Sequence, residues 1–345
     1  MTDRETSSEG AMLLDVRDLD VAYLTEAGQV PACSKINLQL RRGEIIGIAG
    51  ESASGKSTLL TALTRLQRTP AVTTGGEVLY HRVGQSRPVE LVGMEDRELA
   101  PLRWSDISIV MQSAMACLNP VMRLRDQFGD VLKEKNPKIT KRALRQRTAE
   151  LLSMVGIAAD YMNNYPHQLS GGMRQRSLIA LAMACEPELV VMDEPTTAVD
   201  VVMQRRILNQ ILGLQERIGF AIVFVTHDLS LLLEIADRIA IMYGGKIVEI
   251  GTAERLYHGA VHPYTQGLRN SFPPLTEPVR RLQGIPGSPP NLMKLPEGCA
   301  FAPRCSAKID ICDQVRPPLI TVPGGEVACH VAAAKFDDDT EARVG

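Results

Sequence analysis

A glycine-rich segment near the N-terminus has the residue types and the spacing of a phosphate-binding loop. The stretch EIIGIAGESASGKSTLLTAL, residues 44–63, joins a β-branched apolar run to a glycine-rich turn and then to a helical pattern of leucines. In the pattern G-x-x-x-x-G-K-[S/T], backbone N–H groups and a helix N-terminus face an anion, while Lys56 neutralises the outer phosphates and Ser57 binds Mg²⁺. A turn that merely caps a helix is the alternative, and the flanking strand and helix disfavour it. The predicted ligands of the phosphate group are Gly50, Glu51, Ser52, Ala53, Ser54, Gly55, Lys56, Ser57 and Thr58.

Two carboxylates follow a second apolar run. The stretch PELVVMDEP, residues 187–195, has the composition of a buried parallel strand, whose carboxyl end faces the ligand in α/β folds. Asp193 is therefore expected to reach the Mg²⁺ shell, and Glu194 is expected to orient or deprotonate the attacking water. Without the phosphate loop, an acidic pair that caps the next turn would be the better interpretation.

The stretch between these two sites carries a family resemblance. QLSGGMRQR, residues 168–176, resembles the signature motif of the ATP-binding subunits of ABC transporters, and the resemblance extends over nearly the whole chain. It implies that Ser170, Gly171 and Gly172 contact the γ-phosphate of an ATP held by the other subunit. A glycine-bearing helix N-terminus presents N–H groups to an anion, although a lone Ser-Gly-Gly would be only a helix cap.

Four further residues match motifs of this family in the expected order, and each would be weak evidence alone. Gln112 in IVMQS resembles the Q-loop glutamine, which touches Mg²⁺ and links the nucleotide to the permease contact. Asp200 in TTAVD resembles the D-loop aspartate, and His227 in IVFVTHDLS resembles the switch histidine that bonds the γ-phosphate and helps to position water. Tyr23 in LDVAYLTEAG matches the aromatic residue on which adenine stacks.

The phosphate loop departs from the family pattern at one position. Ala53 stands where a glycine is common in transporter loops, so the backbone there must adopt a conformation that a Cβ tolerates. Nucleotide binding is expected to survive this change.

The arrangement of apolar residues predicts the fold. Residues 12–48 and 75–94 show short alternating strands, typical of an antiparallel β layer, and residues 113–169 show helical periodicity. Repair and chromosome ATPases with the same motifs carry a long coiled coil in that interval, and this chain has none. Together with this pattern, the resemblance implies the fold class α/β: a P-loop ABC ATPase with a RecA-like parallel-sheet core, an antiparallel β subdomain, a helical subdomain and a small cysteine-rich C-terminal extension.

The same anchors set the domain boundaries. The predicted segments are a disordered N-terminus at 1–11, a nucleotide-binding domain at 12–258 with its helical subdomain at about 113–169, a C-terminal extension at 259–334 and a disordered acidic tail at 335–345.

The C-terminal extension narrows the family resemblance. HPYT at 262–265, GSPPNL at 287–292 and CAFAPRC at 299–305 resemble the extension of oligopeptide and dipeptide importer ATPases, in the peptide/nickel/opine group. The resemblance implies an ATP-hydrolysing subunit that powers the import of dipeptides or oligopeptides. Oligosaccharide, nickel and opine cargo are the alternatives.

Four cysteines in the extension could bind a metal centre. Their spacing is C-x5-C-x6-C-x16-C, and four thiolates can hold an iron–sulfur cluster or zinc, although structural zinc usually has more closely paired ligands. The family resemblance favours a [4Fe–4S] cluster over zinc and over unliganded thiols. The site is expected to lie away from the ATP chemistry, so Cys305→Ser should lose metal and leave nucleotide affinity nearly intact. The four candidates are Cys299, Cys305, Cys312 and Cys329.

Composition bounds the location and the partners. The chain has 345 residues and a net charge of −2, so it lacks the overall basic charge typical of nucleic-acid binding. The N-terminal sequence MTDRETSSEG has no secretory signal pattern, and the apolar runs are shorter than the roughly 18–20 residues of a membrane span. The expected location is the cytoplasmic face of the membrane, with attachment through permease subunits.

The motif count predicts an assembly. There is one phosphate loop and one signature, so a single copy cannot close an ATP sandwich. The expected partners are a sister ABC ATPase or a second copy of this chain, two transmembrane permease subunits and an extracytoplasmic substrate-binding protein. Nucleic acid is not an expected partner. A soluble ABC-type ATPase that acts on ribosomes or DNA is the alternative class, and the HPYT tail and the net charge count against it.

Overall fold

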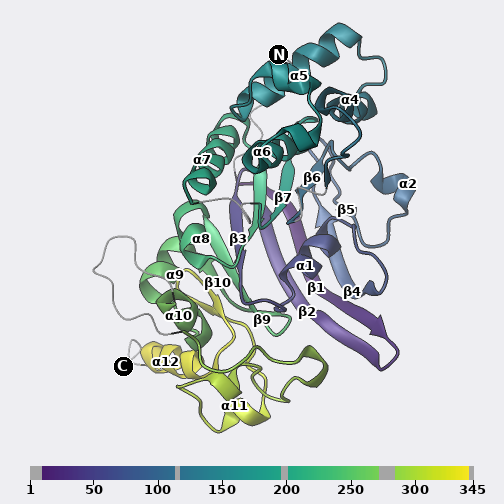
Figure 1. The fold of residues 1–345 in the computed structure, drawn as a ribbon. Coiled ribbons are helices and arrows are strands. Elements are labelled where there is room, and N and C mark those ends of the chain that lie inside the picture. The colour runs from purple at the N-terminus through teal and green to yellow at the C-terminus, as the bar shows by residue number, and fades with distance from the viewer. Residues whose placement is uncertain (1–9, 113–116, 196–200, 272–283, 342–345) are drawn as a thin grey trace. The chain divides into compact units, whose positions relative to one another are not determined.

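The computed structural model describes residues 10–112, 117–195, 201–271 and 284–341 (Figure 1). The chain divides into two compact units. Unit 1 contains residues 1–12, 41–44 and 93–223, and unit 2 contains residues 13–40, 45–92 and 224–345. The chain therefore enters and leaves each unit more than once.

An antiparallel sheet in unit 2 has the strand order β2-β1-β4-β5. Its strands are β1 (Met12–Thr25), β2 (Gly28–Arg41), β4 (Ala71–Tyr80) and β5 (Val89–Glu90). The prediction of short strands is wrong for the first two, because β1 and β2 each extend over 14 residues. The turn between them contains only Glu26 and Ala27, so the two strands continue on either side of a single tight connection.

A second set of strands in unit 2 carries the phosphate loop. β3 (Ile45–Ala49) runs parallel to β9 (Arg238–Tyr243), and β10 (Lys246–Thr252) returns antiparallel to β9. Every residue of β3 is buried. The prediction placed residues 45–48 in the antiparallel layer, and the structure corrects this, because a strand buried on both faces belongs at the centre of a parallel sheet.

The C-terminal extension continues this second sheet. β12 (Gly325–Val327) pairs antiparallel with β10, so that Glu249 lies opposite Val327, and β11 (Ile320–Val322) pairs with β12. A small apolar cluster beside these strands includes Val322, Val327, Cys329 and Ala332. The extension is therefore built onto the edge of the ATPase sheet through backbone hydrogen bonds.

The helices of unit 2 follow the strands. They are α1 (Lys56–Leu63), α8 (Leu229–Ile235), α9 (Ala253–Gly259), α10 (Pro263–Asn270), α11 (Ile311–Gln314) and α12 (His330–Glu341). A disordered tail was predicted from residue 335, but α12 continues to Glu341, so residues 335–341 are helical. The alanine-rich start of α12, VAAAK, explains the difference, because alanine has the highest helix propensity.

Unit 1 combines two parallel strands with a group of helices. β6 (Ile107–Val110) runs parallel to β7 (Leu189–Asp193), and β8 (Ala221–Val225) is the next neighbour of β7. The helices are α2 (Asp96–Leu99), α4 (Leu124–Lys135), α5 (Lys141–Met154), α6 (Gly171–Ala182) and α7 (Val201–Ile218). Helices α4 and α5 occupy the interval whose periodicity predicted helix.

Candidate functional site

The phosphate loop connects the buried strand β3 to α1 and depends on two glycines. A Cβ on Gly50 would lie 2.3 Å from the Met242 carbonyl oxygen, and a Cβ on Gly55 would lie 2.3 Å from the Ala32 carbonyl oxygen. A side chain at either position would therefore force the neighbouring backbone to move. Close backbone packing around the loop fixes its path before any ligand binds.

The interior of the loop holds Lys56. Its Nζ donates to the Gly50 carbonyl at 2.7 Å and to the Glu51 carbonyl at 2.9 Å. The residue before it, Gly55, is the N-cap of α1 and offers no side-chain acceptor to the first turn of the helix. The N–H groups at a helix start need acceptors from outside the helix, so this arrangement fits the oxygens of a phosphate.

Ala53 adopts a backbone conformation that favours glycine. Its φ is +62°, in the left-handed region, where a Cβ costs roughly 1–2 kcal/mol. The expectation was a conformation that a Cβ tolerates. The loop instead retains a left-handed backbone at this position, although alanine replaces the family glycine.

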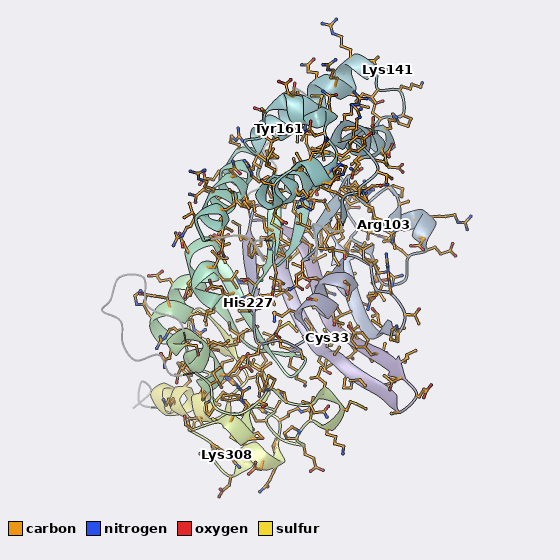
Figure 2. The ribbon with its side chains drawn as sticks, viewed as in Figure 1. Cys33, Arg103, Lys141, Tyr161, His227 and Lys308 are labelled. Carbon is orange, nitrogen blue, oxygen red and sulfur yellow. The ribbon has the colours of Figure 1, made fainter. Side chains whose placement is uncertain are left out.

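Tyr23 and Cys33 lie beside the start of α1. The Tyr23 hydroxyl and the Thr58 hydroxyl are 2.9 Å apart and share a hydrogen bond. Cys33 (Figure 2) is buried; burial first, and then the Asp20 charge, raise the pKa of its thiol to about 12. A buried thiol with a raised pKa is typical of an unreactive core residue.

Two residues of the C-terminal extension contact the loop, and the sequence argument missed both. The Glu51 backbone N–H donates to the Tyr264 hydroxyl at 2.8 Å, and the Glu51 carboxylate pairs with the Arg304 guanidinium. Arg304 directly precedes Cys305 in the CAFAPRC motif. The expectation that the cysteine segment lies away from the ATP chemistry is therefore wrong. The HPYT and PRC motifs were the available signal, but their partner in the loop is more than two hundred residues away.

The acidic pair in unit 1 lies at the end of β7. Asp193 is the last residue of the strand and is buried, and Glu194 follows with a φ of +46°. The Gln112 amide Nε2 donates to Glu194 Oε2 at 2.8 Å. The structure thus brings together Gln112 and Glu194, which lie 82 positions apart in the chain.

The signature segment begins α6. Ser170 is the N-cap, and its hydroxyl accepts a hydrogen bond from the Met173 N–H at 3.3 Å. Ser170 is exposed and Gly171 and Gly172 are half-buried. A Cβ on Gly172 would meet the Met203 side chain, with Cγ at 3.1 Å.

Of the two remaining predicted residues, the structure describes His227 and not Asp200. His227 (Figure 2) is exposed and follows β8 in unit 2, while Asp200 lies outside the residues that the structure describes. The phosphate loop and His227 belong to unit 2, whereas Gln112, Asp193, Glu194 and the signature residues belong to unit 1.

The four cysteines of the extension are free thiols close to one another in unit 2. Burial raises the pKa of the Cys299 thiol, and the charges of Cys312 and Cys329 raise it further. The Cys299 N–H donates to the Cys312 carbonyl at 2.8 Å. Within the described ranges, no group of three or more His, Cys, Asp or Glu side chains has the arrangement expected around a metal ion.

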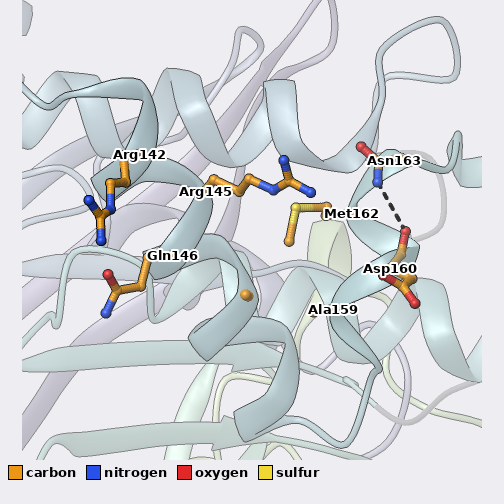
Figure 3. Close-up of a pocket in the computed structure, with 8 residues that line it drawn as sticks. Arg142, Arg145, Gln146, Ala159, Asp160, Met162 and Asn163 are labelled. Atoms are coloured by element: carbon orange, nitrogen blue, oxygen red, sulfur yellow. Dashed lines mark hydrogen bonds between the residues drawn. The ribbon is translucent and has the colours of Figure 1, made fainter.

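A pocket in unit 1 is lined by residues other than those described above. It opens beside α5 and the 3₁₀ turn Ala159–Asn163, with Arg145 and Met162 extending into it (Figure 3). The Asn163 amide donates to the Asp160 carbonyl at its rim, at 3.5 Å. None of the predicted site residues lines this pocket.

Comparison with known proteins agrees with this geometry. Residues 33–197 match the ABC transporter family, and residues 248–312 match the oligopeptide/dipeptide transporter C-terminal region. A solved bacterial ABC transporter cassette in dimeric form has a TM-score of 0.62 and 28% identity, and the match covers 70% of this chain and 99% of that one. The fold and the site therefore define an ABC-type transport ATPase.

Curated relatives are more similar still. The oligopeptide transport ATP-binding protein OppD of Bacillus subtilis is 41% identical over 90% of this chain and 86% of its own length. The dipeptide transport ATP-binding protein DppD of Lactococcus lactis is 40% identical over 90% of this chain and 88% of its own length. The chain belongs to this family of dipeptide and oligopeptide transport ATP-binding proteins, and the predicted family is confirmed.

In the part of the chain that the structure describes, every helix is too short or too polar to cross a bilayer.

Proposed function

We propose that this chain binds MgATP at residues 50–58 and uses its hydrolysis to power the import of dipeptides or oligopeptides through partner permeases. The observation that carries the proposal is the preformed phosphate loop, in which Lys56 is buried and Gly55 leaves the start of α1 open to an anion. The names of the relatives support peptide cargo. Oligosaccharide, nickel and opine cargo are the alternatives, because the binding protein and the permease select the cargo.

The proposed chemistry follows the roles that the family resemblance implies. Ser57 and Gln112 would bind Mg²⁺, Asp193 would reach the Mg²⁺ shell, and Lys56 would neutralise the outer phosphates. The Gln112 amide donates to Glu194 and so orients the carboxylate that accepts a proton from the attacking water. His227 bonds the γ-phosphate.

The proposed site needs a second subunit. Ser170, Gly171 and Gly172 contact the γ-phosphate of a nucleotide bound by the partner, and Asp200 communicates across the dimer. A sister ABC ATPase is the expected partner, with a second copy of this chain as the alternative. ATP stabilises the closed dimer by binding that state more tightly, and hydrolysis releases it.

Tyr23 completes the proposed nucleotide site. Its ring is half-buried and its hydroxyl is fixed by Thr58, so the aromatic face is held in one orientation. Stacking of adenine on this ring contributes about 1 kcal/mol beyond burial. Most of the nucleotide affinity therefore comes from the phosphates.

We propose from the family resemblance that the four thiols of the extension bind an iron–sulfur cluster, and zinc is the alternative. Burial raises the pKa of the Cys299 and Cys305 thiols, and nearby backbone N–H groups, of Phe301 and Ala302 at Cys299 and of Ala307 at Cys305, oppose that rise. Hydrogen bonds from N–H groups to sulfur stabilise thiolate ligands and tune cluster potentials. A bound cluster would supply a rigid link between Cys299, Cys305, Cys312 and Cys329. Metal analysis of anaerobically purified protein distinguishes iron from zinc.

The proposed location is the cytoplasmic face of the membrane. Two permease subunits and an extracytoplasmic substrate-binding protein complete the transporter, and attachment through the permeases needs no membrane span in this chain.

Reconstitution tests the proposed function. The complex of this chain with its permeases and a sister ATPase is placed in proteoliposomes, and ATPase activity and uptake are measured with peptides, oligosaccharides and nickel. ATP-dependent uptake of peptides is the expected result. Failure of the chain to associate with any membrane subunit, or uptake of sugar or nickel in place of peptide, would contradict the corresponding part of the proposal.

A further inference from the structure

We propose that Arg304 of the C-terminal extension is a positioning residue of the phosphate loop, and that nucleotide affinity depends on its ion pair with Glu51. The inference rests on the proposed role of residues 50–58 in binding ATP. It assigns to the extension a part in nucleotide binding, in addition to any role in metal binding.

The contact between Arg304 and Glu51 is bidentate. Arg304 Nη1 lies 2.6 Å from Glu51 Oε2, and Arg304 Nη2 lies 2.9 Å from Glu51 Oε1. The side chains are only 6% and 24% exposed, respectively, so the pair is largely screened from water. Bidentate pairs of this geometry are the strongest that arginine makes, and lysine cannot reproduce them.

The remaining donors of Arg304 fix its orientation. Its Nε donates to the Pro286 carbonyl at 2.7 Å, and Nη1 also donates to the Tyr243 hydroxyl at 3.2 Å. The guanidinium carbon lies 5.8 Å from the centre of the Tyr243 ring and 5.9 Å from that of Phe301. Arg304 is therefore held by its own surroundings and can act as a fixed anchor for Glu51.

A second group from the extension holds the backbone of the same residue. The buried Tyr264 hydroxyl accepts the Glu51 N–H at 2.8 Å, and the Tyr264 ring packs 4.5 Å from the Tyr243 ring. The Gly50 carbonyl, which shares a peptide group with the Glu51 N–H, accepts a hydrogen bond from Lys56 at 2.7 Å. The extension thus fixes both the side chain and the peptide of Glu51, and through that peptide it bears on the position of the Lys56 ammonium.

Arg304 compensates a negative charge beside the proposed triphosphate site. Glu51 is the second residue of the phosphate loop, so an uncompensated carboxylate there would repel the triphosphate. Arg304 offsets this charge in a site with little water. Loss of Arg304 should therefore weaken nucleotide binding in two ways. The loop would lose a contact that fixes its position, and the uncompensated Glu51 carboxylate would repel the triphosphate.

The same segment carries two of the four thiols. Phe301 and Arg304 lie between Cys299 and Cys305, where a single 3₁₀ turn spans Ala302–Arg304. A substitution that disorders this turn also displaces Arg304 and so breaks its contact with Glu51. The structure thus reverses the expectation for Cys305→Ser, which should weaken nucleotide binding if the turn loses its order.

Measurement of nucleotide affinity tests the inference. The dissociation constant of a fluorescent ATP analogue with Mg²⁺ is measured on the full chain. Arg304→Met keeps most of the apolar stem and removes the charge, and it should raise the dissociation constant at least tenfold. Arg304→Lys should fall between Arg304→Met and the wild type.

The double variant separates charge repulsion from simple loss of structure. Glu51→Gln in the Arg304→Met background removes the uncompensated carboxylate, so the dissociation constant should return to within about threefold of the wild type. Circular dichroism establishes that each variant is folded. Lys308→Ala is the matched control: this residue is exposed on the same extension (Figure 2) and pairs with Asp313 at 2.7 Å, so affinity should stay within twofold.

Two results would overturn the inference. One is wild-type affinity in Arg304→Met, and the other is a double variant that binds no better than Arg304→Met. Lys56→Ala identifies failure of the underlying assignment, because wild-type affinity in that variant would show that the loop does not bind ATP. If Arg304→Met does not fold, Arg304→Lys decides: it keeps the positive charge and loses the bidentate contact, so it should raise the dissociation constant, and wild-type affinity in that variant would overturn the inference.

Discussion

The phosphate loop and the signature segment are both glycine-bearing helix starts, yet their surroundings differ. The phosphate loop packs closely against the backbone of Ala32, and its Lys56 side chain is buried. The N-cap of α1 is Gly55, which has no side chain to cap the helix. The signature helix α6 is capped by its own exposed Ser170. The first helix start is enclosed and lacks a cap, whereas the second is exposed and caps itself.

The difference between the two helix starts indicates which of them can bind an anion without a second subunit. A helix start with fixed backbone and no internal cap is organised for phosphate before the ligand arrives. A capped, exposed helix start is stable without a ligand and can meet one that another subunit carries. The phosphate loop should therefore bind nucleotide in the isolated chain, and the signature should matter only when two ATPase subunits meet.

The largest expected effect separates binding from turnover. Glu194→Gln should retain ATP binding and lower the hydrolysis rate by about 10²–10⁴-fold, because the group that accepts the proton is lost. ATP should then hold the dimer closed, which size-exclusion chromatography in MgATP detects. Rapid hydrolysis by this variant would contradict the role of Glu194 and remove the evidence for a partner-dependent signature.

A matched glycine pair tests the comparison directly. Gly55→Ala should destabilise the chain by on the order of 3 kcal/mol and abolish nucleotide binding, because the new Cβ collides with the Ala32 carbonyl at a left-handed φ of +105°. Gly172→Ala contacts only the flexible Met203 side chain, so folding and nucleotide affinity should be retained. Thermal melts and analogue binding measure both variants, and equal losses of nucleotide binding would break the comparison.

Acid should affect the support of the phosphate loop through His262. This residue caps α10 by accepting the Tyr264 N–H on Nδ1, and burial lowers its pKa from 6.5 to about 4. The unfolded chain takes up the proton first as the pH falls. The contribution to stability is therefore complete above pH 6.5 and is lost between pH 6.5 and 4, by roughly 3 kcal/mol.

The control for this effect keeps the helix cap. His262→Asn retains an acceptor for the Tyr264 N–H and has no titration in this range. Urea denaturation at several pH values should show a shallower loss of stability in the variant than in the wild type. Identical pH dependence of the two proteins would show that His262 is not responsible.

The smallest expected effect concerns the strain inside the loop. Ala53→Gly should stabilise the folded chain by about 0.5–1 kcal/mol, because glycine adopts a φ of +62° without steric cost, although it loses more entropy on folding. Thermal denaturation measures the change, and nucleotide affinity should stay the same. A destabilised variant would mean that the alanine methyl makes a contact that outweighs the backbone cost.

Local spacing predicted much of the molecule. The strand, loop and helix around Lys56, the buried strand before Asp193 and the helix after Ser170 are all present, because each depends on neighbours within a few residues. The length of β1 and the end of α12 were mispredicted, because the residues at the ends of helices and strands carry weak local signals of where the element stops. The contact between Gln112 and Glu194 was not predicted, because it joins residues 82 positions apart.

The sequence by itself determined the class of the protein and its chemistry, since a glycine pattern, a lysine and a strand-end carboxylate pair act through their immediate neighbours. Only the tertiary structure placed the terminal extension against the phosphate loop. Arg304 and Glu51 are 253 positions apart, and no local period or propensity encodes a contact between them. Their pairing depends on β3, β9 and β10 lying together and on the aromatic side chains packed beside them, which exist only in the folded chain.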